Sequence, residues 1–173
     1  GGSERRWLAD LIDDILANPE IRMRDEQLRS RGLEPALVRR TFKRRFGMTF
    51  HAYQRACRLG TALQALHRGA PTLDAGLEAG FESDSGFREA FLRTFGSAPG
   101  RARSSDALTA QWIETPLGPM LAVATKDRLA LLEFVDRRAL ETELTAMRQR
   151  LGAAIVPGRN DVLTATATQL AEY

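Results

Sequence analysis

Apolar residues in the first hundred positions recur at intervals of three and four, the spacing of one face of an α-helix. Leu11 and Ile15 belong to the first such series, and Asn18 and Pro19 end it. A short helix with one inward leucine is predicted over residues 25–31. This part of the chain is therefore expected to consist of helices joined by short turns.

Further helices are predicted over residues 35–46, 50–67, 72–79 and 83–95. The helices at 25–31 and 35–46 form one unit, those at 72–79 and 83–95 form a second and similar one, and the helix at 50–67 connects them. Pro35 suits the first turn of a helix, since its φ is already helical and its missing N–H is not needed there. Either Ser83 or Asp84 caps the last helix. Each unit has a short helix, a glycine and a longer helix ending in Phe-Gly, which indicates an internal duplication of a helix-turn-helix.

The pattern changes after a predicted linker at residues 104–110. Short segments rich in Ile, Val, Leu and Phe predict strands at residues 111–115, 120–125, 128–134 and 153–156. Helices are predicted over 136–151 and from Asp161 onward, the last without a C-terminal cap. We expect a mainly α protein with a small α+β part, in which residues 4–103 form one domain and residues 111–173 a truncated second one.

The net charge of +3 is unevenly distributed. Residues 21–68 carry 12 Lys and Arg against 3 Asp and Glu, whereas residues 104–173 carry 7 against 9. Such a basic segment attracts phosphate polyanions, although a solvated basic face is an equally open interpretation. The one cysteine and two histidines form no zinc pattern, and no apolar run could span a membrane. A cytoplasmic protein with no metal and no cofactor is expected.

The helix at 35–46 is the first candidate for DNA recognition. Val38 and Phe42 fall on its apolar face, whereas Arg39 and Arg40 fall on the opposite side. Either arginine could read a guanine bidentately in the major groove, which is wide enough for one helix. The alternative is an amphipathic surface helix whose arginines are only solvated.

The helix at 83–95 is the second candidate and is less basic. Its phenylalanines repeat every four residues and are predicted to be core. Glu89 could accept a hydrogen bond from cytosine, but we favour a surface carboxylate that repels phosphate. The predicted base contacts are Ala36, Arg39, Arg40, Asp84, Ser85 and Arg88. The predicted phosphate contacts are Lys43, Arg44, Arg45, Thr49, Arg55, Arg101 and Arg103. No residue is predicted to be catalytic.

The residues also resemble known families. The segments GFESDSGFREAF (80–91) and FGSAP (95–99) resemble the AraC-type DNA-binding domain, and GMTFHAYQR (47–55) resembles the Ada-type adaptive-response proteins. ETPLGPMLAVAT (114–125) is similar to the start of the non-catalytic, ribonuclease-H-like subdomain of a methylated-DNA–protein-cysteine methyltransferase. Thr72 and Gly76 depart from the pattern, because the family usually has aliphatic residues there. Glycine inside a helix costs about 1 kcal/mol, so we expect a less stable second unit.

The resemblance implies a sequence-specific transcriptional regulator of the alkylation response that binds double-stranded DNA as a monomer and contacts RNA polymerase. The alternative is a DNA alkyl-cysteine transferase, an enzyme of DNA repair. The acceptor of that enzyme is a cysteine in a Pro-Cys-His-Arg motif. Cys57 lies instead between Ala56 and Arg58. Because no histidine adjoins this thiol to promote its ionisation, we expect the chain to be inactive as an enzyme.

Overall fold

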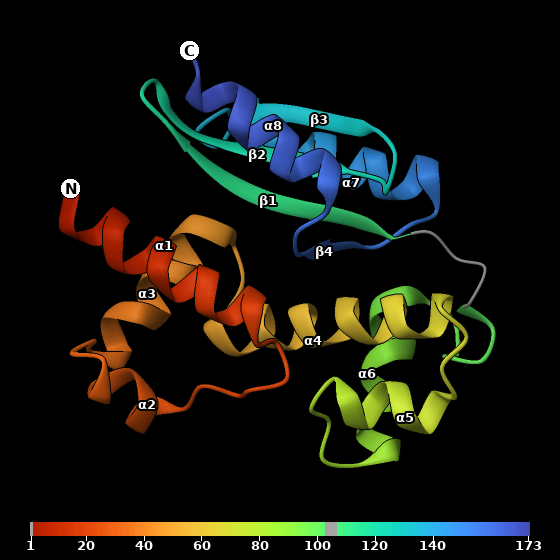
Figure 1. Ribbon diagram of the computed structural model, residues 1–173. Coiled ribbons are helices and arrows are strands. Elements are labelled where there is room, and N and C mark those ends of the chain that lie inside the picture. Colours follow the sequence, from red (N-terminus) through yellow and green to blue (C-terminus); the bar gives the residue numbers. More distant parts are fainter. Residues whose placement is uncertain (1, 103–106) are drawn as a thin grey trace. The chain divides into compact units, whose positions relative to one another are not determined.

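The computed structural model describes residues 2–102 and 107–173 (Figure 1). The chain divides into two compact units, Gly1–Glu89 and Ala90–Tyr173. The boundary between them falls within helix α6, so this helix contributes residues to both units.

Helices make up the first unit. They are α1 (Gly2–Ala17), α2 (Asp25–Ser30), α3 (Pro35–Phe46), α4 (Phe50–His67), α5 (Thr72–Glu78) and the start of α6 (Asp84–Phe95). In Figure 1, α1, α2 and α3 gather around the beginning of α4, and α5 lies near its end. The predicted helical character of this part of the chain is confirmed, with boundaries that differ by at most one residue from α3 to α6.

Local signals explain where these helices begin and end. Pro35 occupies the first turn of α3, and Gly47 ends that helix with a left-handed φ of 70°. The hydroxyl of Thr49 caps α4 by accepting a hydrogen bond from the backbone N–H of Ala52 at 3.1 Å. Ser83 caps α6 in the same way by accepting from the N–H of Gly86, also at 3.1 Å. Of the two caps considered for α6, Ser83 therefore fills the role.

An apolar cluster joins α1, α3 and α4. Phe42 is fully buried and makes edge-to-face ring contacts with Phe50 at 4.9 Å and Tyr53 at 5.0 Å between ring centroids. Leu11 of α1 and Val38 of α3 belong to the same cluster. Packing of this density fixes which face of α3 is buried and leaves its arginines on the other side.

Gly76 allows α6 to pack closely on α5. A Cβ atom at this position would lie 2.6 Å from Cδ2 of Phe87, a distance that real Cβ atoms do not show. Both residues are buried. The glycine that departs from the family pattern therefore has a packing reason, which offsets its cost to the helix.

The second unit contains a sheet with a helix on each face. Its elements are β1 (Leu108–Thr115), β2 (Gly118–Ala124), β3 (Leu129–Phe134), α7 (Leu140–Leu151), β4 (Ile155–Pro157) and α8 (Asp161–Ala171). The strand order is β3-β2-β1-β4, and only the β1–β4 pairing is parallel. Residues 121–124 of β2 are all buried, because α7 packs beside Leu121 and Val123 and α8 beside Ala122 and Ala124.

Four predicted boundaries in this unit were wrong by two residues or more, and one of them is the start of β4, at Ile155 rather than 153. The first strand begins at Leu108, within the predicted linker, because this buried leucine pairs with Ile155 of β4. The second begins at Gly118, which pairs with Thr115 across the hairpin. Helix α7 begins at Leu140 rather than 136, after a turn in which Arg137 pairs with Glu133. The start of the first strand depends on a distant partner, Ile155, which local periodicity does not report. Gly118 and Arg137 instead pair with residues three and four positions away.

Candidate nucleic-acid interface

The exposed face of α3 carries the predicted base-reading residues. Ala36, Arg39 and Arg40 are exposed, whereas Val38 and Phe42 are fully buried. The predicted orientation of this helix is therefore confirmed. A helix that buries one stripe and presents arginines on the other has the form needed to enter a major groove.

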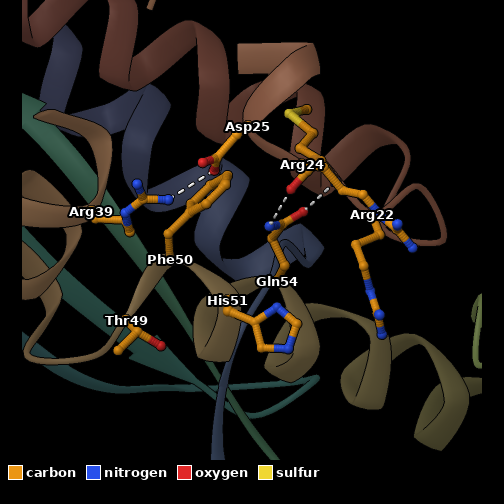
Figure 2. A pocket seen from close by; sticks show the side chains of 9 residues that line it. Arg22, Arg24, Asp25, Arg39, Thr49, Phe50, His51 and Gln54 are labelled. Carbon is orange, nitrogen blue, oxygen red and sulfur yellow. Dashed lines mark hydrogen bonds and ion pairs between the residues drawn. The ribbon is translucent and has the colours of Figure 1, made fainter. Parts of the chain in front are cut away.

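Arg39 is held by a carboxylate from α2. Its Nη1 donates a hydrogen bond to Oδ1 of Asp25 at 2.8 Å (Figure 2). Asp25 is the first residue of α2, so this contact links the beginning of one helix of the unit to the exposed face of the next. Arg39 is thus positioned by its neighbour, and sequence reasoning missed this partner. An acidic residue at the start of a helix was the only available signal.

A groove of about 470 Å³ lies beside this pair. Its polar lining includes Arg22, Arg24, Asp25, Arg39, Thr49 and His51 (Figure 2). The groove is formed by the segment before α2, the exposed face of α3 and the first turn of α4. The three arginines and the N-terminus of α4 make it suited to an anionic group such as a phosphate.

Gln54 holds the segment before α2 in place. Its buried side chain accepts a hydrogen bond from the N–H of Met23 at 2.7 Å and donates one to the carbonyl of Met23 at 3.2 Å. This bidentate contact fixes the backbone between Arg22 and Arg24, which both line the groove. Sequence analysis did not identify Gln54, Arg22 or Arg24, because nothing local relates α4 to a segment 31 residues earlier.

His51 lies in the same groove and is surrounded by cations. Burial lowers the pKa of its imidazole below the usual value of 6.5, and the charges of Arg55, Arg22 and Arg58 lower it further. The ring is therefore mainly neutral at pH 7. A neutral imidazole can still donate one N–H to a phosphate oxygen.

Two of the predicted phosphate contacts pair with α1. Glu4 accepts a hydrogen bond from Nη2 of Arg44 at 2.6 Å, and Nη2 of Arg45 lies 3.5 Å from the same oxygen. Burial raises the pKa of Glu4, but the two guanidinium groups outweigh it and the net change is downward. These arginines tie α1 to the end of α3, and a role with DNA would have to compete with that contact.

Helix α6 also pairs an exposed arginine with a carboxylate, here from within the same helix. Nε of Arg88 donates to Oδ2 of Asp84 at 2.7 Å, one turn earlier in α6. Ser85 and Glu89 are exposed, and Asp84 is half-buried. The predicted base-contacting residues of α6 thus lie together near its N-terminus, the part of a recognition helix that contacts base edges.

The remaining predicted contacts are dispersed. Lys43 is exposed and its ammonium donates to the carbonyl of Gly47 at 3.3 Å. Arg55 is half-buried on α4, and Arg101 is exposed in the second unit. Arg103 lies outside the described residues. The groove collects only Arg39 and Thr49 from the predicted set, and it adds residues that were not predicted.

Helix α4 connects the two helix-turn-helix units. It contacts α1 and α3 as well as α5. Its 18 residues correspond to a length of about 27 Å at 1.5 Å per residue. Successive major grooves on one side of a duplex are about 34 Å apart, so a helix of this length is a suitable connector.

Three further observations concern the length of apolar helices, groups of metal-ligating side chains and the one cysteine. No helix within residues 2–102 and 107–173 combines the length and apolar character that crossing a bilayer requires. The same ranges contain no group of three or more side chains able to hold a metal ion. Cys57 is buried in α4, and this burial raises the pKa of its thiol to about 12.

Comparison with known proteins supports this description of the helical part. Residues 29–105 match a family described as "Helix-turn-helix domain". A search of curated proteins gave no match. A solved transcriptional regulator with an AraC-type DNA-binding domain, from Chromobacterium violaceum, is 23% identical. The match covers 61% of this chain and 98% of that one, with a TM-score of 0.52.

Two further solved structures are less similar in fold. "A probable AraC family transcriptional regulator" from Rhodopseudomonas palustris is 25% identical over 53% of this chain and 89% of its own, with a TM-score of 0.48. The C-terminal domain of the two-component response regulator yesN from Fusobacterium nucleatum is 17% identical. That match covers 59% of this chain and 99% of the domain, with a TM-score of 0.49. The family match and the Chromobacterium structure together show that residues 29–105 contain a helix-turn-helix domain with the fold of the AraC-type DNA-binding domains, which indicates DNA binding.

Proposed function

We propose that this chain is a sequence-specific transcriptional regulator that places α3 and the beginning of α6 in successive major grooves of one duplex. The observation that carries the proposal is the exposed Arg39–Arg40 pair on α3, beside a groove lined by further arginines. Direct base readout needs side chains on the exposed side of a helix whose other side is anchored, and α3 meets this requirement. With two recognition helices in one chain, a monomer is sufficient.

The proposed contacts fall into two classes. Ala36, Arg39, Arg40, Asp84, Ser85 and Arg88 would face base edges. Lys43, Arg44, Arg45, Thr49, Arg55, Arg101 and Arg103 would contact phosphates. For Arg44 and Arg45 this role requires exchange of the Glu4 carboxylate for a phosphate. The change is smaller for Arg44, whose side chain is exposed, than for the half-buried Arg45.

The regulator is proposed to be of the Ada type and to act in the alkylation response in the cytoplasm. Residues 108–173, which include the whole of β1, would then be the non-catalytic, ribonuclease-H-like subdomain of a methyltransferase. Support comes from the segment at 114–125 and from a sheet that carries one helix on each face. RNA polymerase is the proposed protein partner, since an activator must contact it.

The alternative function, transfer of an alkyl group to cysteine, has little support. Only a thiolate attacks an alkyl group, and it needs a nearby base or cation and access to the substrate. Cys57 is buried and its pKa is about 12, so its thiolate is scarce and enclosed.

Selection of binding sites from random duplexes at two salt concentrations tests the proposal. The unmodified chain should enrich one sequence, and log Kd should rise with log salt as phosphate contacts release counterions. Arg39→Ala and Arg40→Ala should each relax preference at one base pair by about 1–3 kcal/mol. Arg128→Ala, which removes an exposed arginine of the second unit, is the matched control. Equal loss on every sequence would contradict base reading by α3.

The link to alkylation needs a separate experiment. A reporter gene downstream of the selected sequence should respond to a methylating agent in cells that produce this protein. A reporter that responds to a different signal would contradict the alkylation role and leave sequence-specific DNA binding intact.

A further inference from the structure

The Arg39–Asp25 ion pair is largely exposed to solvent. The side chains are 55% and 43% exposed, so the pair lies at the surface rather than in the core. Exposed pairs typically contribute less than about 1 kcal/mol to folding. Its main physical effect is therefore on where the Arg39 guanidinium points and on the charge beside it.

Asp25 also places a negative charge where phosphate would otherwise bind. It is the only carboxylate among the described residues that line the groove, which also contains Arg22 and Arg24. Oε1 of Glu82, in the turn before α6, lies 4.0 Å from Nη1 of Arg22 and 3.6 Å from Nη2 of Arg24. The carboxylates therefore weaken the attraction of the groove for any phosphate, whatever the base sequence.

Guanine recognition is affected differently. A guanidinium has five N–H donors, and the contact with Asp25 uses one of them. Bidentate binding to O6 and N7 of guanine needs two more, which remain available. A carboxylate that restrains the guanidinium lowers the entropy lost when the base contact forms.

The second helix-turn-helix contains the same pairing from a different origin. Arg88 pairs with Asp84 four residues away in one helix, whereas Arg39 pairs with Asp25 fourteen residues away in another. The two pairs are therefore not copies of one local sequence pattern. In each helix-turn-helix, a carboxylate nevertheless accepts a hydrogen bond from an exposed arginine of the second helix.

We infer that Asp25 is a specificity-determining, positioning residue for α3. It orients Arg39 for guanine and opposes the binding of Arg39 to phosphates of non-specific DNA. The inference rests on the proposed function and adds to it a residue that touches no base itself. Its consequence is a higher ratio of specific to non-specific affinity rather than a higher affinity.

The test compares two duplexes of equal length, the sequence enriched by selection and a scrambled version of it. Fluorescence anisotropy gives Kd for each with the full chain. In Asp25→Asn, binding to the scrambled duplex should strengthen several-fold, and the ratio of the two affinities should fall about tenfold. Asp25→Glu, which keeps the carboxylate, should recover part of the ratio.

Glu26→Gln is the matched control, since it removes the same charge from the next residue of α2, which does not line the groove. An unchanged ratio in Asp25→Asn, or an equal change in Glu26→Gln, would overturn the inference and leave the proposed function standing. An unmodified chain without any sequence preference would overturn both. Circular dichroism and the urea midpoint verify that each variant is folded.

Discussion

The guanidinium carbon of Arg58 lies 5.5 Å from the centre of the Phe81 ring, and Arg58 is fully buried. None of its three side-chain nitrogens has a hydrogen-bond partner among the described residues. Burial, with Arg22 and Arg55 nearby, lowers the pKa of Arg58 to about 10, so the group remains charged at neutral pH. A buried charge without hydrogen bonds normally destabilises a fold, and the ring face offsets only part of that cost.

Replacing Arg58 by methionine should therefore leave the protein as stable or make it more stable. Methionine keeps an unbranched chain against Phe81 and removes the buried charge, and such replacements gain up to about 1–4 kcal/mol. The free energy of unfolding from urea titration at pH 7 is the measurement. Arg55→Met, which replaces a half-buried arginine of the same helix, should change the free energy of unfolding by less than about 0.5 kcal/mol. A large loss in Arg58→Met alone would mean that the guanidinium is well satisfied.

A second prediction concerns two glycines with the same backbone conformation. Gly69 and Gly80 both have φ of 89°, but a Cβ at Gly80 would lie 2.3 Å from the carbonyl oxygen of Glu20, whereas nothing lies within 4 Å at Gly69. Gly69→Ala should cost about 1–2 kcal/mol of unfolding free energy, the price of a left-handed residue. Gly80→Ala should cost about 1–3 kcal/mol more than Gly69→Ala, because the backbone at Glu20 must move to make room for the new methyl group.

Urea denaturation of the two glycine variants separates strain from steric overlap. The difference between them measures how tightly the segment before α2 packs on the turn before α6. Equal losses would show that this packing yields easily.

Cys57 should react slowly in the folded protein. Because burial raises the pKa of its thiol from 9.0 to about 12, the thiolate fraction at neutral pH falls about a thousandfold. The rate of reaction with a thiol reagent should fall at least as far, and mass spectrometry should detect no methyl group after incubation with methylated DNA. The same labelling in urea provides the unfolded reference. A methylated Cys57 would contradict the assignment and revive the transferase alternative.

Stability should decrease as the pH falls through the titration of His51. Its pKa in the folded state is below 6.5, so the unfolded chain binds the proton more readily and protonation favours unfolding. The loss sets in below about pH 6.5 and is complete below the folded pKa. His51→Gln should reduce the change in melting temperature between pH 7 and pH 5.

His67→Gln is the control for the pH experiment, since it replaces the chain's other histidine, at the exposed end of α4. If His51→Gln and His67→Gln lose equal stability between pH 7 and pH 5, other groups account for the acid sensitivity of the chain. In that case the cations around His51 would not affect its titration.

Much of the helical part was predictable because its signals are local. Pro35, Gly47 and Thr49 act on their own turn of the backbone, so the boundaries of α3 and α4 follow from the neighbouring residues. The buried and exposed faces of α3 follow from the helical period in the same way. The glycine at position 76 could not be explained in this way, since it makes room for the ring of Phe87, which belongs to another helix.

The sequence by itself determined the succession of helices, the change to strands after the first hundred residues, and the concentration of cations in residues 21–68. Only the tertiary structure decided which cations lie in the groove and which are paired elsewhere. Arg39 meets Asp25, while Arg44 and Arg45 meet Glu4 some forty residues away. The physical reason is that backbone conformation depends on adjacent residues, whereas the partner of a charged side chain depends on which helices the apolar core brings together.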